Sequence, residues 1–282
     1  MLGSRKEEIQ AAWFGNSAWG VFSEQHSIKG QVALAPLGIR GIPITNVENA
    51  CADASTAFHE AWMAVGSGLY DVALAVGAEK LFYPEDRPKM FRTLAMGVDQ
   101  DHREEQFRMW QELATNISLP GLSSEEAPVA DKDKSAFMDI YGGMARWHMQ
   151  KYGTTQRQLA IISSKNHYHG SLNPYAQYRK KMTVEEVLAD KLVSYPITRP
   201  MCSPISDGAA AAILCSGDYL RKLSDVRPIK VLASILGGGM DRPLEAEDDD
   251  IGVRLGRQAH EAAGVGPEDI DIAEVHDATA FG

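Results

Sequence analysis

The chain has 282 residues, of which 44% are hydrophobic and 23% are charged, and its formal net charge at pH 7 is −10. Such a composition is typical of a globular protein with one large or two moderate domains. The negative charge excludes nucleic-acid binding by bulk electrostatics, and no apolar run is long enough to span a membrane. The first eight residues lack the apolar stretch of a secretory signal, which predicts a cytoplasmic or similarly reducing location.

Three cysteines, Cys51, Cys202 and Cys215, are scattered along the chain without a CxxC pair. An odd count without an export signal argues against a disulfide framework. No His/Cys cluster has the spacing of zinc ligands, so no metal site is predicted. His167 and His169, the nearest approach to one, point in different directions on a helix and are interpreted as surface residues.

The predicted elements begin with a strand over residues 9–15, which ends at Gly15, and a helical stretch over 27–37. A β-prone segment over 42–47 then leads to Cys51. The apolar residues that follow recur with helical spacing, at Ala54, Ala57, Phe58, Ala61, Trp62 and Val65. A buried strand over 71–77 comes next. This alternation predicts parallel βαβ units, with a sharp strand-to-helix turn at Cys51.

The position of Cys51 at or near a helix N-terminus carries a chemical implication. Unpaired N–H groups and the positive end of the helix dipole favour a thiolate over a thiol there. A thiolate so placed is a candidate nucleophile. A lone cysteine is also commonly a small buried hydrophobe, and the spacing alone leaves both interpretations open.

The segment from about residue 81 to 200 is more polar, richer in Met, Trp and Tyr, and predicted to be largely helical. We interpret it as a long excursion from the α/β core. It contains a helix over 137–152 ended by Gly153, and capping-box patterns at 155–158 and 183–186 open two more helices. Pro196 and Pro200 are expected to close the last of these. The charged stretch over 125–134 is predicted to be an exposed loop.

The α/β core resumes at the Asp207-Gly208 turn, which leads into a buried strand of small residues ending near Leu214. A strand over 229–236 and a helix over 252–263, stopped by Gly264, follow. A final strand over 270–275 is expected to deliver His276 and Asp277 at its carboxyl end, where open α/β sheets place their sites. Taken alone, His276 is more simply a strand-end histidine hydrogen-bonded to its surroundings.

Four segments in this order resemble the thiolase superfamily, most closely the sterol-carrier-protein-type thiolases and their bacterial lipid-transfer-protein relatives. The resemblance extends over nearly the whole chain. Residues 47–52 (Val-Glu-Asn-Ala-Cys-Ala) look like the nucleophile loop, and residues 166–177 are similar to part of the loop domain. Residues 202–211 resemble the strand that closes the N-terminal half. Residues 274–277 (Glu-Val-His-Asp) look like the His-Asp motif of this subgroup.

The resemblance implies a thiolase-like α/β fold, with duplicated βαβαβαββ halves in a layered α/β/α/β/α arrangement and an inserted helical loop domain. The N-terminal half would span residues 1–216, with the loop-domain insertion at about 81–200, and a partial C-terminal half would span 228–282. The family's first strand and helix, its later Gly-His-Pro loop and its second catalytic cysteine have no counterpart in this sequence. The chain is therefore expected to correspond to the middle of a thiolase, as a fragment or as a divergent remnant.

The resemblance also implies an acetyl-CoA C-acyltransferase-like enzyme in which Cys51 attacks a thioester carbonyl and holds the acyl group. The backbone N–H of Cys51 and the His276 side chain would stabilise the oxyanion, with Asn49 and Asp277 supporting the loops. Coenzyme A is then the substrate carrier, and no separate cofactor is expected. Arg179 and Lys180, in the densest basic run, are the candidate residues for binding it.

Two positions depart from the family pattern. Ala278 follows the His-Asp pair, at a position where sterol-carrier-type thiolases commonly have Cys. If that Cys acts as an acid or base in those thiolases, no residue replaces it at this position. Asp53 lies two residues after Cys51, where small or hydroxyl residues are common. A carboxylate near a thiolate opposes its ionisation, unless Asp53 instead caps the helix start.

Three functions follow from these observations. The first is a thiolase or acyltransferase acting on fatty or sterol-derived acyl-CoA, assembled as a homodimer or larger. The second is a retro-aldolase of steroid side-chain CoA esters that works with a small OB-fold partner; Ala278 favours it, and the retention of Cys51 argues against it. The third is a non-catalytic lipid-binding or scaffolding subunit.

Overall fold

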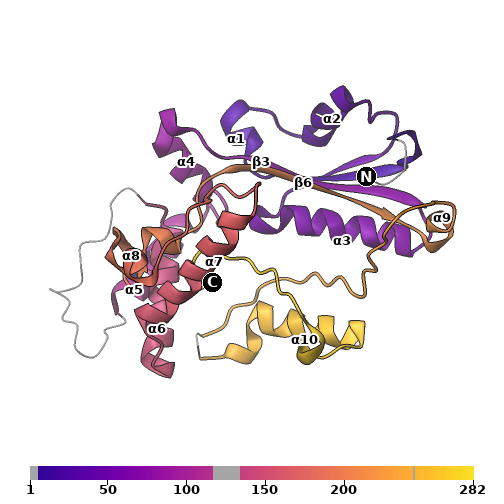
Figure 1. Cartoon of the computed structure of the whole chain (residues 1–282). Helices are drawn as coiled ribbons and strands as arrows, with labels where there is room; N and C mark the ends of the chain where they lie inside the picture. Colours follow the sequence, from indigo (N-terminus) through magenta and orange to yellow (C-terminus); the bar gives the residue numbers. More distant parts are fainter. Residues whose placement is uncertain (1–5, 117–133, 244) are drawn as a thin grey trace. The chain divides into compact units, whose positions relative to one another are not determined.

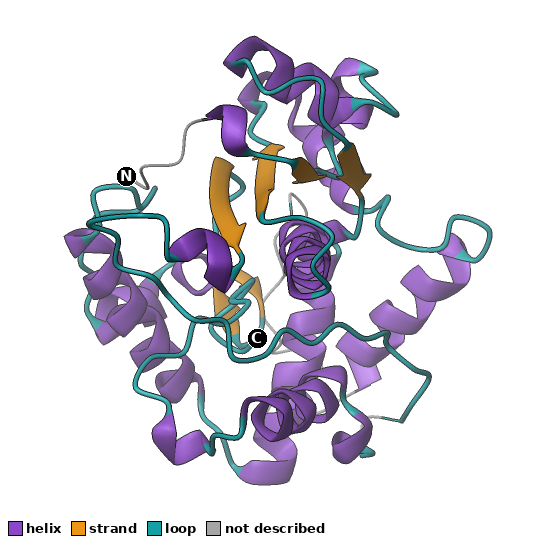
Figure 2. Cartoon of the chain, turned by 90° about the vertical axis from the view of Figure 1, so that its right-hand side faces the viewer, coloured by secondary structure: helices purple, strands orange, loops and turns teal. Residues whose placement is uncertain are grey.

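The computed structural model describes residues 6–116, 134–243 and 245–282. The chain divides into two units, of which unit 1 comprises residues 1–81 and 207–273 and unit 2 comprises residues 82–206 and 274–282. Helices make up most of the regular structure (Figure 2). No helix in the described ranges is both long and apolar enough to cross a membrane.

Unit 1 is built on a four-stranded sheet with the order β2-β1-β3-β6. Three strands, β1 (Ala11–Gly15), β2 (Ile44–Val47) and β3 (Val72–Lys80), run parallel, as the βαβ pattern predicts. The strand β6 (Asp207–Cys215) pairs antiparallel with β3 along its full length. The predicted α/β class is confirmed, and the sheet is mixed.

Alternate residues of the strands face two separate apolar layers, because side chains in a strand point to opposite faces. Trp13 and Ala75 pack with α3 (Asp53–Gly66) on one face. Leu74 packs with Leu34 of α2 (Lys29–Leu34) on the other. Figure 1 shows α3 along one face of the sheet, with α1 (Trp19–Ser23) and α2 on the opposite face. The sheet thus has helices on both sides, and its strand ends meet the start of α3.

The remaining elements of unit 1 are mostly short. They are the 3-10 turns η1 (Lys6–Glu8), η2 (Ala35–Leu37), η3 (Ala50–Ala52), η6 (Glu247–Asp249) and η7 (Pro267–Asp269), and the helices α9 (Gly217–Leu220) and α10 (Ile251–Ala263). The helix predicted over 252–263 is therefore confirmed, and Gly264 ends it with a left-handed φ of 69°.

Two of the predicted strands are wrong. Residues 229–236 and 270–275 adopt no strand in the described chain, and Ile229 and Ile272 are 90% and 80% exposed. A β-prone sequence becomes a strand only when another strand satisfies its backbone groups. Neither segment has such a neighbour among the described strands. His276 is consequently not delivered by a strand.

Unit 2 is mainly helical. Its elements are η4 (Pro84–Asp86), α4 (Arg87–Leu94), α5 (Arg103–Asn116), α6 (Phe137–Tyr152), α7 (Gln156–Leu172), α8 (Val184–Ala189), the strands β4 (Leu192–Ser194) and β5 (Ile197–Thr198), and η5 (Arg199–Met201). A core of Ala145, Leu159, Val187, Ile197 and Met201 joins α6, α7, α8, β5 and η5. The final residues pack on this core, since Ala280 N donates to Met201 O at 2.8 Å.

The local predictions for unit 2 agree with the structure. The helix over 137–152 ends at Gly153, and both capping boxes form, at Thr155 with Gln158 and at Thr183 with Glu186. The expected role of Pro196 is wrong, because α8 already ends at Ala189 and Pro196 lies between β4 and β5. The predicted loop over 125–134 lies outside the described residues, apart from Lys134.

Candidate active site

Cys51 lies in the turn that joins β2 to α3. Val47 ends the strand, η3 holds Cys51, and α3 begins at Asp53. The predicted strand–turn–helix unit is confirmed, and the Cys51 residue is exposed with a free thiol. Ala50, immediately before it, has a φ of 47°. A left-handed backbone at a non-glycine residue costs about 1 kcal/mol and persists only where the surrounding structure holds it.

Two glycines let this turn sit directly on the sheet. A Cβ at Gly15, the last residue of β1, would lie 2.7 Å from the carbonyl carbon of Asp53. A Cβ at Gly77 in β3 would lie 2.3 Å from the Cβ of Ala54. Both distances are shorter than real Cβ contacts, so a larger residue at either position would force the strand or the first turn of α3 to move.

Asn49, a predicted support residue, bonds across the same turn. Its Nδ2 donates to Thr56 Oγ1 at 2.9 Å, and Thr56 Oγ1 donates to Ala52 O at 2.7 Å. The backbone N–H of Ala52 also donates to Asn49 O at 2.9 Å. Asn49 thereby links the residues on either side of Cys51 to the first turns of α3.

A polar network that the sequence analysis missed lies at the carboxyl ends of the parallel strands. The buried Lys29 donates through Nζ to Asn16 O at 2.9 Å and pairs with the Glu48 carboxylate. Asn16 Nδ2 donates to Glu79 Oε1 at 2.8 Å, and Glu79 Oε2 accepts from the Ser17 N–H at 2.9 Å. The sequence could have indicated this network by the positions of its residues at strand ends. Asn16 and Glu48 directly follow β1 and β2, and Glu79 lies near the end of β3.

Asp53 joins this network from the first turn of α3. Its Oδ2 accepts from Ser17 Oγ at 3.1 Å. Burial raises the pKa of the Asp53 carboxyl above its usual range, and the nearby charge of Glu79 adds to the increase. The N-cap of α3 is Ala52, so the alternative that Asp53 caps the helix is wrong.

His276 and Asp277 lie in unit 2 and are both exposed. The residues after them are fixed by backbone pairing, since Ser203 N donates to Ala278 O at 3.1 Å and Thr279 bridges Cys202. Of the predicted residues, Asn49 and Cys51 are brought together in unit 1. The others, His276, Asp277, Arg179 and Lys180, belong to unit 2.

Asp277 lines a cavity of about 270 Å³ in unit 2, together with His167, Tyr178 and Cys202. His167 Nε2 lies 3.1 Å from Pro200 O, and its ring stacks on that of Tyr178 at 6.2 Å. The surface interpretation is confirmed for His169, which is exposed on α7. His167 is half-buried, because residues 173–178, which follow α7, fold back along it and place Tyr178 against the His167 ring.

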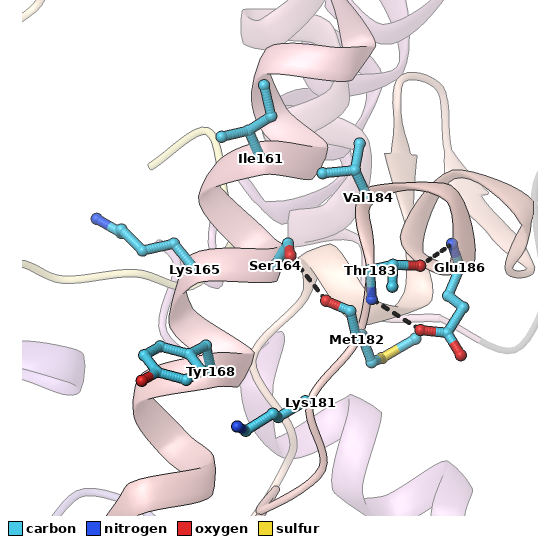
Figure 3. Close-up of a pocket in the computed structure, with 9 residues that line it drawn as sticks. All are labelled: Ile161, Ser164, Lys165, Tyr168, Lys181, Met182, Thr183, Val184 and Glu186. Atoms are coloured by element: carbon cyan, nitrogen blue, oxygen red, sulfur yellow. Dashed lines mark hydrogen bonds between the residues drawn. The ribbon is translucent and has the colours of Figure 1, made fainter.

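A second cavity of unit 2, about 540 Å³, lies between α7 and the segment that leads into α8 (Figure 3). Lys165 and Tyr168 project from α7, and Lys181 projects from the facing segment with its Nζ 4.8 Å from the centre of the Tyr168 ring. The predicted Arg179 and Lys180 are exposed neighbours of this cavity along the chain and do not line it. The basic run that contains Lys181 can be recognised from the sequence. Lys165 lines the same cavity as Lys181 only because the chain folds back against α7.

The three free cysteines occupy different environments. Burial raises the pKa of the Cys202 thiol to about 12, and burial also raises that of Cys215. Cys51 is the exposed one of the three. Within the described part of the chain, no three His, Cys, Asp or Glu side chains are placed to hold a metal ion.

The family model "Thiolase, N-terminal domain" matches residues 3–218. The chain belongs to the thiolase family. Among its relatives within that family, the acetyl-CoA acetyltransferase of Methanothermobacter thermautotrophicus is 36% identical over 273 residues, which are 96% of this chain and 63% of the relative. The benzoylsuccinyl-CoA thiolase subunit BbsB of Thauera aromatica is 32% identical over 97% of this chain and 62% of its own length.

Sterol carrier protein 2 of Bos taurus is a further relative, 32% identical over 94% of this chain and 44% of its own length. The chain thus spans less than two thirds of the length of these thiolase-family relatives. Two solved structures share the fold at 18% identity. The Ltp2-ChsH2(DUF35) aldolase has a TM-score of 0.65 over 99% of this chain and 65% of its own. The Acat5 thiolase from Ascaris suum in complex with coenzyme A has a TM-score of 0.60 over 98% of this chain and 71% of its own length.

Proposed function

We propose that this protein is a thiolase-like acyltransferase that acts on acyl-CoA thioesters through an acyl group carried on Cys51. In this reaction the Cys51 sulfur attacks the thioester carbonyl, the bond from that carbon to the CoA sulfur breaks, and CoA leaves as its thiol. In condensation the acyl group then passes to the α-carbon of a second thioester, which loses a proton as the carbon–carbon bond forms and the bond to Cys51 breaks. In thiolysis a carbon–carbon bond breaks instead when Cys51 attacks, and the acyl group passes from Cys51 to CoA. Membership of the thiolase family supports this class of chemistry.

The observation that carries the proposal is the setting of Cys51. Its free thiol is exposed on a turn held against the sheet by close glycine contacts and by the Asn49 bonds. Cys202 and Cys215 are partly buried, and their pKa values are raised. A nucleophilic side chain must be accessible to its substrate and must be held in a fixed orientation. Of the three cysteines, Cys51 is the one that is both exposed and located on a tightly held turn.

His276 and the backbone N–H of Cys51 are the proposed donors to the oxyanion that forms during attack, with Asp277 and Asn49 as supporting residues. Cations would bind the phosphates of coenzyme A. Arg179 and Lys180 are proposed to bind these phosphates. The cavity lined by Lys165, Tyr168 and Lys181 supports adding Lys165 and Lys181 to the phosphate-binding residues, with Lys181 placed over the Tyr168 ring.

The other parts of the proposal follow the family resemblance. Residues 1–216 would be the N-terminal half, with the loop-domain insertion at about 81–200, and 228–282 would be part of the C-terminal half. A cytoplasmic homodimer, or a larger assembly, would be the working form. A small OB-fold partner is proposed only for the retro-aldolase alternative, which the replacement of the expected Cys by Ala278 favours.

The direct test is to incubate the full chain with acetyl-CoA and to locate a covalent acetyl group by peptide mass spectrometry. We expect the adduct on Cys51, its loss in Cys51→Ala, and its retention in Cys215→Ala, a matched cysteine deletion in the same unit. An acetyl group that persists elsewhere in Cys51→Ala would contradict the proposal.

The same protein separates the alternatives. Release of an aldehyde or ketone from a β-hydroxyacyl-CoA that is insensitive to Cys51→Ala would identify a retro-aldolase. Acyl-CoA binding with neither reaction would identify a non-catalytic lipid-binding subunit.

A further inference from the structure

Charge is distributed unevenly along this acidic chain. Between Asp139 and Glu185 the sequence contains no Asp or Glu, although the whole chain has a net charge of −10. The cations in this interval are Arg146, Lys151, Arg157, Lys165, Arg179, Lys180 and Lys181. The acidic residues at its end are already bonded, because Glu185 pairs with Arg157 and Glu186 closes the capping box at Thr183. Part of unit 2 is therefore basic, in contrast to the chain as a whole.

One side of α7 presents both apolar and basic side chains to solvent. Its exposed residues are Ile161, Lys165, Tyr168 and Leu172. Their spacing of three or four residues places them along one side of the helix. An amphipathic helix ordinarily turns such an apolar stripe toward the core. The core contacts of α7 come from other positions instead, namely Leu159, Ala160 and Ser163.

The segment that follows α7 is held against this helix. Ser164 Oγ donates to Met182 O at 2.7 Å, and a Cβ at Gly170 would lie 2.8 Å from Tyr178 O. These contacts fix the returning chain at two places. The surface that α7 and the segment form together is therefore already shaped before any partner binds.

The returning segment adds cations to the exposed side of α7. Arg179, Lys180 and Lys181 are all exposed. Figure 3 shows Lys165 and Tyr168 projecting from α7 and Lys181 facing them, with the Lys181 Nζ 4.8 Å from the centre of the Tyr168 ring. Cations from two segments thus lie beside the apolar side chains of the helix.

Tyr175 lies at the tip of the returning segment and is 95% exposed. A tight turn holds it, since its N–H donates to Asn173 Oδ1 at 2.9 Å and Ala176 N donates to Asn173 O at 3.2 Å. Leu172, the last residue of α7, comes directly before this turn and is 64% exposed. Two large apolar side chains therefore protrude next to the cations.

Protruding apolar side chains beside cations match the surface of an anionic bilayer. Tyrosine sits at the level of the lipid headgroups, leucine reaches the acyl boundary, and Lys and Arg are attracted to anionic lipids. A soluble phosphate group, including one of coenzyme A, would engage the cations and leave Leu172 and Tyr175 in water. A protein partner would need a pocket for each protruding side chain, whereas a bilayer accepts them without a matching shape.

We propose that Lys165, Tyr168, Leu172, Tyr175 and residues 179–181 form a docking surface by which unit 2 binds an anionic lipid bilayer. The protein would lie on the membrane, with Leu172 and Tyr175 entering the headgroup region and the cations at the level of the lipid phosphates. This interaction goes beyond the proposed acyl transfer and does not depend on it.

The test is sedimentation of the full chain with vesicles of phosphatidylcholine alone and with vesicles that contain about 30% phosphatidylserine. We expect at least about tenfold tighter binding to the anionic vesicles, because the cations are attracted to them. This difference should be lost at about 0.5 M salt, which screens exposed charges. Equal binding to both kinds of vesicle, or binding to neither, would overturn the proposal.

A first pair of substitutions isolates the apolar part of the docking surface. Leu172→Ser combined with Tyr175→Ser removes two exposed side chains and no charge, and we expect about tenfold weaker binding to the anionic vesicles. Ile272→Ser is the matched control, because Ile272 is 80% exposed but follows Asp271, and it should bind as the wild type does. Wild-type binding by the Leu172 and Tyr175 variant would mean that charge acts alone, which would overturn the docking surface as proposed.

A second pair isolates the charge. Arg179→Gln combined with Lys180→Gln removes two exposed cations, each of which strengthens binding to an anionic surface by about fivefold. We therefore expect about 25-fold weaker binding to the anionic vesicles. Lys230→Gln, an exposed lysine of unit 1, is the control and should have no such effect. Equal losses in Lys230→Gln and in the double variant would contradict a surface confined to unit 2.

The outcome is independent of the acetylation experiment, because vesicle binding requires no acyl transfer. The Leu172 and Tyr175 variant is expected to retain acetylation of Cys51 by soluble acetyl-CoA. Vesicle binding without an acetyl adduct supports the docking surface and removes the proposed acyltransferase function. An acetyl adduct without vesicle binding keeps that function and removes the docking surface.

Discussion

Cys51 in unit 1 and Cys202 in unit 2 carry the same thiol in opposite settings. Cys51 is exposed on a turn between a strand and a helix, and the backbone around it is fixed by Asn49 and by the close approach of Gly15. Cys202 follows η5, pairs with Thr279 through its backbone, and has a pKa raised to about 12 by burial. Packing around the sulfur, rather than residue type, separates a candidate nucleophile from an inert core residue.

The largest expected effect is the difference in reactivity of these two thiols. At pH 8 a thiol with a pKa of about 12 is ionised in only about one molecule in ten thousand. We expect iodoacetamide to alkylate the exposed Cys51 at least about 100-fold faster than Cys202, because burial both keeps the Cys202 sulfur protonated and restricts access to it. Site-resolved mass spectrometry of the native protein measures the two rates. Unfolding in denaturant is the control and should bring the two rates together. Similar alkylation rates for Cys51 and Cys202 in the native protein would contradict the expected difference in reactivity.

The next effect concerns the glycine contact that holds the nucleophile turn. In Gly15→Ala the new Cβ would lie 2.7 Å from backbone of Asp53, so either the turn or β1 must move. We expect a loss of about 2 kcal/mol in the free energy of unfolding, measured with urea, and slower acetylation of Cys51. Gly208→Ala in β6 is the matched control, because its Cβ meets nothing within 4 Å. Equal stability of the two variants would argue against tight packing at the turn.

The smallest effect is on stability at Asp53, in the polar network at the carboxyl ends of the parallel strands. The folded-state pKa of Asp53 is raised, so its contribution to stability is fully present below the unfolded-state pKa and is lost as pH rises through the folded-state pKa. Asp53→Asn should therefore unfold less readily than the wild type at neutral pH, by less than about 1 kcal/mol, and lose this advantage in acid. Thermal unfolding at several pH values measures it, with Glu60→Gln as the comparison. A destabilised Asp53→Asn at neutral pH would mean that the Ser17 bond outweighs the buried charge.

The features that the sequence predicted are those governed by neighbouring residues. The helix Phe137–Tyr152, its Gly153 end, the capping boxes at Thr155 and Thr183, and the turn at Cys51 follow from local periodicity and side-chain bonds within four residues. The family resemblance rests on the same kind of short segment. The candidate nucleophile could therefore be located before any coordinates were known.

Other features depended on residues far apart in the chain. β6 proved antiparallel to β3, and residues 229–236 and 270–275 formed no strand, because pairing partners decide both outcomes. The bond from Ser17 to Asp53 and the ion pair of Lys29 with Glu48 join different elements, as do Lys165 and Lys181 at one cavity. The sequence by itself determined where the thiol of Cys51 would be presented. Only the tertiary structure decided which charged side chains meet at the strand ends and which thiols are buried, because burial and electrostatics depend on distances that the order of residues does not contain.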